Sequence, residues 1–210
     1  MASTDQTFLD RVFAAKSQEE TRNLYDQWAS SYNTDMETYS FTAPRLVAQV
    51  LSKYLKVPPE STTIVDAGCG SGLVGVELNK LGFHTIDGLD LSEGMLKVAE
   101  KTGAYRNLKV TDLTKRLEAD DSTYDALTCC GTFTHGHLGP DPLPEMARIV
   151  KSGGVLAVTI LESFWKEGDF AGVVKGLEKE RIVEVLENDV HNYRKFGQEE
   201  SGGLVEEIDL

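Results

Sequence analysis

The sequence has few cysteines and few basic residues. Its three cysteines, Cys69, Cys129 and Cys130, include an adjacent pair in an apolar segment, so they do not form the disulfide framework of a small secreted protein. Lys and Arg number 21 against 34 Asp and Glu, which gives a formal net charge of −13 at pH 7. A surface that binds nucleic acid or an anionic membrane needs basic residues gathered on one face, so we expect neither partner.

Long apolar runs and repeats are also missing. No apolar run approaches the roughly 18 residues of a membrane-spanning helix, and residues 1–10 lack the charged start and apolar centre of a signal peptide. With reduced cysteines, these absences predict a cytoplasmic protein. The composition is ordinary for a globular protein, with 40% hydrophobic and 26% charged residues, and 210 residues can form one domain with a core that needs no disulfide.

The clearest motif is the stretch IVDAGCGSGLVGVEL at residues 64–78. An apolar strand ends at Asp66 and Ala67, and a helix begins a few residues later. The backbone turns tightly between them through three alternating glycines, Gly68, Gly70 and Gly72. Free amides at the amino end of the helix favour an anionic or polar ligand, and in an open α/β sheet this turn lies at the crevice where a cofactor binds.

This glycine-rich turn fits two known patterns. Gly70, Gly72 and Gly75 match G-x-G-x-x-G, the fingerprint of dinucleotide-binding proteins. Asp66 and the three alternating glycines instead match D-x-G-x-G-x-G, the loop of class I S-adenosylmethionine methyltransferases. We favour the second pattern, because a carboxylate at Asp66 would repel a dinucleotide pyrophosphate but can attract the ammonium group of S-adenosylmethionine through water or backbone. A glycine turn without a ligand is the least favoured interpretation.

Strands and helices alternate after this turn. The predicted strands are 63–66, 84–90, 108–111, 124–130 and 155–161, and the predicted helices are 73–81, 92–102, 142–150 and 170–180. This alternation indicates parallel pairing in a doubly wound, Rossmann-like α/β fold. Residues 181–193, with a break near Asn188, and residues 204–208 are predicted as an antiparallel hairpin at the edge of the sheet.

The segment before the first strand is predicted to be mainly helical. Helices are expected at 7–15, 19–32 and 44–56, with a polar loop at 33–42. The second helix carries an apolar stripe at Leu24, Tyr25, Trp28 and Tyr32. Either this helix only packs on the domain, or it covers the cofactor, with Tyr25 or Tyr32 reaching the site. We therefore divide the chain into a helical segment, 1–57, that packs on and lids the site, and a cofactor-binding domain, 58–210, which together form one structural unit.

Two acidic residues at strand ends are candidates for the cofactor site. Asp90 closes the second predicted strand, where a carboxylate can accept hydrogen bonds from both hydroxyls of a ribose, which S-adenosylmethionine and NAD share. Asp112 follows the third strand and can face the amino group of an adenine. Leu91, Met95 and Leu113 would then flank the adenine ring. The alternatives are a helix cap or solvated acid for Asp90, and a turn residue for Asp112.

The segment CCGTFTHGHLGP, residues 129–140, leaves the fourth strand at the point where the strand order reverses, so it would face the transferable methyl group. His135 and His137 are candidate general bases, since imidazole titrates near neutral pH. Gly136 between them allows the loop to aim them differently. Both histidines could instead only hold the loop, and a metal pair lacks a third ligand. An apolar strand raises the pKa of the Cys130 thiol, so Cys130 is interpreted as a wall of the site.

With these motifs, the chain resembles the class I S-adenosylmethionine-dependent methyltransferases. It is more narrowly similar to the methyltransferase-like family that includes a protein of the Williams–Beuren syndrome region. The matching pieces are YDQWASSYNTDM (25–36), DAGCGSGLVG (66–75), GLDLSEGML (88–96), GTFTHGHLGP (131–140) and RIVKSGGVL (148–156). The resemblance implies S-adenosylmethionine binding at Gly68, Gly70, Asp90 and Asp112. It also implies a seven-stranded sheet of order 3-2-1-4-5-7-6 with the last strand antiparallel, and it does not supply an acceptor.

The sequence thus predicts a methyltransferase for a small-molecule acceptor. The methyl group would pass in line to an oxygen or nitrogen, mainly by positioning. The predicted cofactor site is Tyr32, Asp66, Ala67, Gly68, Gly70, Asp90, Leu91, Met95, Asp112, Leu113 and Cys130, and the predicted catalytic residues are His135 and His137. We expect no metal, and a monomer or weak dimer. The alternatives are an S-adenosylmethionine-binding protein without catalysis, which the fold alone does not separate, and a NAD-dependent oxidoreductase, which Asp66 and a missing Tyr-x-x-x-Lys pair disfavour.

Overall fold

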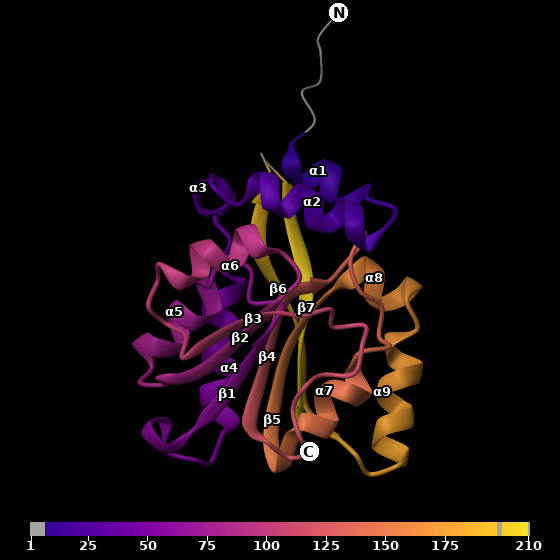
Figure 1. The fold of residues 1–210 in the computed structure, drawn as a ribbon. Coiled ribbons are helices and arrows are strands. Elements are labelled where there is room, and N and C mark those ends of the chain that lie inside the picture. The colour runs from indigo at the N-terminus through magenta and orange to yellow at the C-terminus, as the bar shows by residue number, and fades with distance from the viewer. Residues whose placement is uncertain (1–6, 197–198, 210) are drawn as a thin grey trace, which may run out of the picture.

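A twisted sheet in the order β3-β2-β1-β4-β5-β7-β6 runs through the molecule, with helices on both faces (Figure 1). The computed structural model describes residues 7–196 and 199–209. The strands are β1 (Thr63–Ala67), β2 (Thr85–Asp90), β3 (Asn107–Val110), β4 (Tyr124–Phe133), β5 (Val150–Leu161), β6 (Glu184–Phe196) and β7 (Glu199–Asp209). The first five are parallel, so the predicted doubly wound order 3-2-1-4-5 is confirmed. β7 is antiparallel to both β5 and β6.

Helices cover the two faces of the sheet. One side carries α4 (Ala43–Tyr54), α5 (Leu73–Lys80) and α6 (Glu93–Glu100), and the other carries α7 (Leu143–Ile149), α8 (Glu162–Glu167) and α9 (Phe170–Lys179) (Figure 1). A short 3-10 turn, η1 (Pro59–Ser61), precedes β1. Because successive strand residues point to opposite faces, Ile64 packs under α4 and α5 while Val65 packs on the α7 and α9 side. This alternation builds two separate apolar cores.

Three further helices, α1 (Phe8–Phe13), α2 (Gln18–Trp28) and α3 (Tyr32–Thr38), lie across the carboxyl ends of the strands (Figure 1). They form a third apolar cluster around Leu24, Trp28 and Met36. Thr7 and Asp10 cap the start of α1 reciprocally, and the Ser17 hydroxyl caps the start of α2. The N-terminal helices therefore have local start signals and an apolar face of their own.

The structure corrects several predicted boundaries. The polar loop expected at 33–42 was wrong, because residues 32–38 form α3, and the helix expected at 19–32 already ends at Trp28. The indole of Trp28 donates a hydrogen bond to Asp35 Oδ2 at 2.6 Å, and Met36 is buried, so tertiary contacts outweigh the polar sequence. β4 continues to Phe133 rather than ending at residue 130. α8 was not predicted, β6 extends to residue 196 rather than 193, and β7 begins at residue 199 rather than 204.

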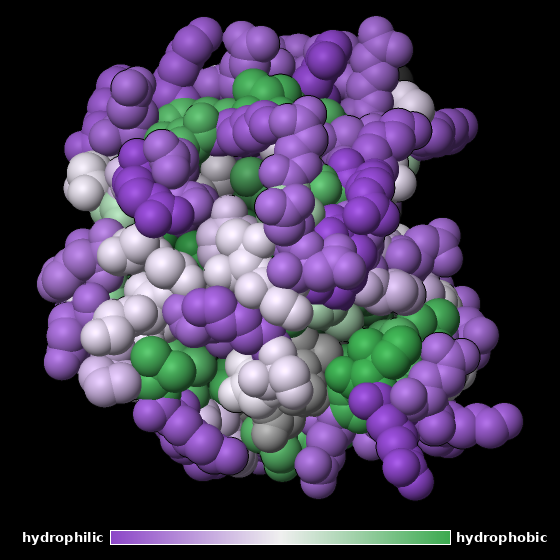
Figure 2. Space-filling view, turned by 60° about the horizontal axis from the view of Figure 1, so that its bottom comes forward, coloured by the Kyte–Doolittle hydropathy of each residue, from purple (hydrophilic) through white to green (hydrophobic). Residues whose placement is uncertain are grey.

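The face seen in Figure 2 is mostly hydrophilic, with apolar residues in separate small groups. Among the residues whose side chains are described, the exposed large apolar residues are Leu81, Val110, Ile182 and Val190, and no two of them are adjacent in the sequence. Among the described residues, no helix has the length and apolar character needed to cross a lipid bilayer.

Candidate functional site

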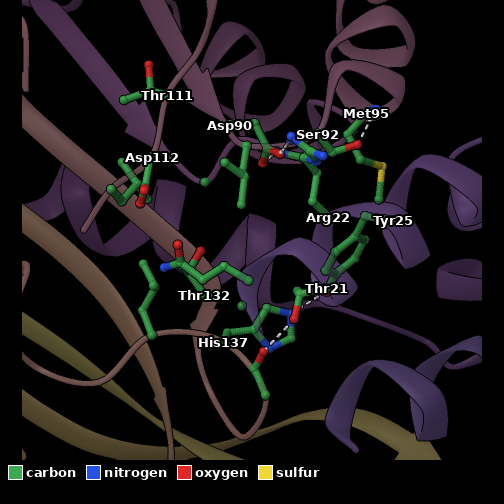
Figure 3. Close-up of a pocket in the computed structure, with 18 of the residues that line it drawn as sticks. Thr21, Arg22, Tyr25, Asp90, Ser92, Met95, Thr111, Asp112, Thr132 and His137 are labelled. Carbon is green, nitrogen blue, oxygen red and sulfur yellow. Dashed lines mark hydrogen bonds between the residues drawn. The ribbon is translucent and has the colours of Figure 1, made fainter. Parts of the chain in front are cut away.

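A cavity opens at the carboxyl ends of β1, β2 and β4, and α2 covers it (Figure 3). Asp90, Ser92 and Met95 lie along one side of it, and Thr21 and His137 along the opposite side. Ten predicted site residues line this cavity: Tyr32, Gly68, Gly70, Asp90, Leu91, Met95, Asp112, Leu113, Cys130 and His137. The structure therefore brings most of the predicted site together, from five separate segments of the chain.

The glycine turn forms the floor of the cavity. Gly68 and Gly70 have φ values of 75° and 51°, which side chains with a Cβ rarely adopt. A Cβ at Gly68 would lie 2.3 Å from Thr132 Oγ1, so a second constraint excludes a larger residue there. The backbone amides of Gly68 and Cys69 both donate to the carbonyl oxygen of Leu89. These bonds hold the turn against the end of β2.

Asp66 and Ala67 lie beneath the turn and do not line the cavity. Both are fully buried. The carboxylate of Asp66 accepts hydrogen bonds from Tyr105 Oη at 2.7 Å and from Thr128 Oγ1 at 2.8 Å. Burial raises the pKa of Asp66 to about 6, against the effect of these two hydrogen bonds. We expected Asp66 to attract the ammonium group of a ligand. In the structure its carboxylate instead binds other residues of the protein, linking β1 to Thr128 in β4 and to Tyr105.

Asp90 connects the end of β2 to the glycine turn. Its Oδ2 accepts a hydrogen bond from the Gly70 amide at 2.8 Å, and its Oδ1 accepts one from the Ser92 amide at 2.8 Å. Burial raises the pKa of Asp90, and the nearby Asp26 carboxylate acts in the same direction. Each carboxylate oxygen can accept more than one hydrogen bond. Asp90 therefore retains acceptor capacity toward the cavity that it lines.

The remaining predicted cofactor residues form apolar walls and one polar corner. Met95 and Leu113 are buried and line the cavity. Asp112 lines the cavity while its Oδ1 also accepts hydrogen bonds from the amide and hydroxyl of Thr114. Burial raises the pKa of the Cys130 thiol, so this side chain stays protonated at neutral pH and forms a wall.

The two candidate bases point in different directions. His137 lines the cavity, and its Nε2 lies 2.8 Å from Tyr25 Oη. Its Nδ1 lies 3.0 Å from the carbonyl oxygen of His135, and because a carbonyl can only accept, the proton is on Nδ1. Tyr25 therefore donates to Nε2. His135 itself does not line the cavity: its Nε2 lies 3.1 Å from Ser163 Oγ, and its ring contacts Phe164.

Sequence reasoning missed the polar residues of α2 that complete the cavity. Gln18, Thr21 and Arg22 line it, beside Tyr25 of the same helix. The Thr21 hydroxyl donates to the Gly136 carbonyl at 2.8 Å. The apolar stripe indicated Tyr25, but no local signal marked its polar neighbours, and the partner of Thr21 lies 115 residues further along the chain.

Two further side chains, Asp26 and Asn33, attach the N-terminal helices to the rim. Asp26 Oδ1 accepts hydrogen bonds from Ser92 Oγ at 2.6 Å and from the Gly94 amide at 2.8 Å. Asn33 Oδ1 accepts one from Ser71 Oγ, in the glycine turn, at 2.6 Å. The N-terminal helices are thus bonded to the glycine turn, to α6 and to the loop after β4.

This architecture is similar to that of known methyltransferases. Residues 65–158 match the family model described as a methyltransferase domain. The matched segment runs from β1 to β5 and contains the glycine turn and Asp90. A solved TehB-like S-adenosylmethionine-dependent methyltransferase from Corynebacterium glutamicum superposes with a TM-score of 0.63 at 23% identity, covering 88% of this chain and 97% of that one. At that identity the likeness shows the fold alone.

Two curated relatives are each similar to this chain over 65% of its length. Methyltransferase-like protein 27 of Homo sapiens is 36% identical over 138 residues, which is 65% of this chain and 56% of that protein. A ubiquinone biosynthesis O-methyltransferase of Alkalilimnicola ehrlichii is 31% identical over 147 residues, covering 65% of this chain and 55% of that protein. The chain spans little more than half the length of these relatives.

Proposed function

We propose that this protein is an S-adenosylmethionine-dependent methyltransferase that acts on a small-molecule acceptor at oxygen or nitrogen. The observation that carries the proposal is one continuous cavity that joins the glycine turn and Asp90 to the Tyr25–His137 pair. The similarity to an enzyme named for O-methylation in ubiquinone biosynthesis supports a small acceptor.

The cavity residues suit S-adenosylmethionine. The turn offers room and backbone groups for the amino-acid end at Gly70, because a Cβ added there would meet no heavy atom within 4 Å. Asp90 would accept hydrogen bonds from the ribose hydroxyls. Met95 and Leu113 would flank the adenine, with Asp112 near its amino group. When bound, this cofactor supplies an electrophilic methyl group on a sulfonium.

His137 is proposed as the general base. Its Nε2 faces the cavity rim as an acceptor, so it can take the proton of an acceptor hydroxyl or amine in place of the Tyr25 hydroxyl. The His135 carbonyl holds the Nδ1 proton, which orients the ring and stabilises the imidazolium that forms. The remaining rate enhancement comes from positioning the acceptor in line with the methyl group.

We further propose that residues 1–57 act as a lid on the domain formed by residues 58–210, and that the two parts form one structural unit. The hydrogen bonds of Thr21, Asp26 and Asn33 to the rim support this role. Such lids exclude water and complete the site around a bound substrate. The net charge of −13 supports a small molecule rather than nucleic acid as partner, and a monomer or weak dimer and a cytoplasmic location stay predictions.

Calorimetric titration with S-adenosylmethionine, S-adenosylhomocysteine and NAD tests the cofactor, followed by incubation with a metabolite pool and mass spectrometry. We expect both adenosyl compounds to bind and NAD not to bind, with one S-adenosylhomocysteine formed per methylated product. Saturable NAD binding without a response to S-adenosylmethionine would overturn the proposal. Binding without formation of S-adenosylhomocysteine on any acceptor would leave a non-catalytic binding protein.

A further inference from the structure

A second cavity lies beneath the N-terminal helices, beside the cofactor cavity. The two cavities share Tyr25, Tyr32, Gly131 and His137 as common walls. The second one is enclosed mainly by aromatic side chains, namely Phe13, Tyr25, Trp28, Tyr32, Phe41 and Phe133. The second cavity therefore adjoins the cofactor cavity at the proposed base, His137.

Thr134 supplies an unusual polar group to this aromatic cavity. It follows β4, is 7% exposed, and lines the second cavity. Its Oγ1 is buried and has no hydrogen-bond partner among the residues that the structure describes. Thr159, on the same wall, differs, because its Oγ1 accepts a hydrogen bond from the Gly131 amide at 2.8 Å. A buried hydroxyl without a partner destabilises the folded protein, and a bound ligand that forms a hydrogen bond with Thr134 Oγ1 would remove this cost.

The walls also limit the charge of that ligand. No Asp, Glu, Lys or Arg is among the described residues that line this second cavity. A carboxylate or phosphate would lose its hydration there without gaining a counter-ion, which is unfavourable. Aromatic walls instead favour a flat apolar ring, which packs against them face to face or edge to face.

We propose that this cavity is the acceptor subsite, that it takes a small neutral compound with an apolar ring, and that Thr134 Oγ1 hydrogen-bonds the polar substituent of the ring. The inference rests on the proposed methyltransferase function and names its substrate class. Thr134 is a positioning residue in this arrangement, whereas His137 deprotonates the reacting group on the shared wall.

Entry of a ring requires movement of the N-terminal helices. The cavity measures about 30 Å³, which suffices for about two water molecules but not for a ring. Helices α1, α2 and α3 supply one of its walls through Leu9, Trp28 and Met36. The acceptor therefore binds as these helices shift outward, and its ring replaces contacts that the aromatic residues make with one another in the closed form.

The test compares phenol with toluene, which have nearly the same shape but differ by one hydroxyl, on the full chain saturated with S-adenosylhomocysteine. Ligand-observed NMR titrations give the dissociation constants for the wild type and for Thr134→Val. We expect the wild type to bind phenol at least about fivefold more tightly than toluene, and we expect the ratio to fall toward one in Thr134→Val. The affinity for S-adenosylhomocysteine should stay within about twofold, and the melting temperature should rise because an unpaired hydroxyl is removed.

Thr159→Val is the matched control, since it removes a hydroxyl from the same wall that already has a partner. It should keep the preference for phenol and should lower the melting temperature. Equal binding of phenol and toluene to the wild type, or a preference that persists in Thr134→Val, would overturn the inference, as would failure of both compounds to bind. Tighter binding of benzoate or benzylamine than of phenol would show that the ligand is charged and would also overturn it.

The same titrations separate this inference from the proposed function. If S-adenosylhomocysteine does not bind before the probes are added, the proposed function fails. If S-adenosylhomocysteine binds and the phenol preference is missing, only the acceptor assignment fails.

Discussion

The Asp26 carboxylate on α2 lies 2.6 Å from Ser92 Oγ, and Ser92 in turn caps the amino end of α6 by accepting a hydrogen bond from the Met95 amide. Asp26 also accepts from the Gly94 amide, so one N-terminal side chain occupies the start of the helix that follows Asp90. A carboxylate at a helix amino end is favourable, since it faces free amides and the positive end of the dipole. This contact connects the proposed lid directly to the ribose side of the cavity.

Replacement of Asp26 should loosen the lid. In Asp26→Ala we expect faster amide hydrogen exchange across residues 19–42 and a loss of stability of about 1 kcal/mol, the usual cost of a lost helix cap. Glu19→Gln is the control, because Glu19 is exposed on the same helix and has no hydrogen bond to the rim. In the wild type, S-adenosylhomocysteine should slow exchange across residues 25–35. Equal exchange with and without the ligand would contradict the lid.

Cofactor affinity should depend strongly on Asp90. Asp90→Ala removes two charge-assisted hydrogen bonds to the ribose, each about 1.5–3 kcal/mol, so calorimetry should show at least about 10²-fold weaker binding of S-adenosylhomocysteine. Asp120→Ala, the same change at an exposed acid, should leave the affinity unchanged. A folded Asp90→Ala protein with wild-type affinity would show that Asp90 only supports the glycine turn and α6.

Asp66 should make stability depend on pH. Its pKa of about 6 in the folded protein exceeds the ordinary value of 3.8, so the folded state keeps a proton that the unfolded chain has lost. The stability that this provides is fully present below about pH 4 and is lost as the pH rises through 6. The shift corresponds to about 3 kcal/mol.

Urea unfolding of the wild type and of Asp66→Asn at pH 4 and pH 7 measures this effect. The variant lacks the titration, so its stability relative to the wild type should be about 2 kcal/mol more favourable at pH 7 than at pH 4, because part of the effect is already lost at pH 4. Using the difference between two proteins cancels the contributions of Asp87, Asp125 and Glu145, whose lowered pKa values act in the opposite direction. Asp120→Asn, the same change at an exposed acid, controls for the effect of the substitution itself. An equal relative stability at both pH values would contradict the raised pKa.

The sequence predicts this site where its signals are local. The glycine turn and Asp90 stand next to the strands whose periodicity marks them, and the parallel strand order follows from alternation of strands and helices. The contacts of the N-terminal helices are different in kind, because Asp26 and Ser92 are 66 residues apart and Thr21 and Gly136 are 115 apart. No local pattern indicates such pairs. α3 was missed for a different reason: its sequence is polar, and the hydrogen bond that stabilises it joins Trp28 to Asp35, only seven residues away, across the break between α2 and α3.

His137 provides the most direct test of the chemistry. If its Nε2 accepts the proton of the acceptor, His137→Gln should reduce turnover by about 10²–10⁴-fold, the usual contribution of a general base. The affinity for S-adenosylhomocysteine should remain nearly intact, because the ring lies on the acceptor side of the cavity. Turnover is measured as S-adenosylhomocysteine formed with the acceptor that the metabolite screen identifies.

Two neighbouring residues serve as comparisons for His137. His135→Gln changes the other histidine of the loop, which faces Ser163 and Phe164, so we expect turnover close to that of the wild type. Tyr25→Phe removes the hydroxyl that donates to Nε2 and should have a smaller effect than His137→Gln, because the base itself is retained. Full activity in His137→Gln would mean that the imidazole only fastens the loop to α2, and methyl transfer would then rest on proximity and orientation alone.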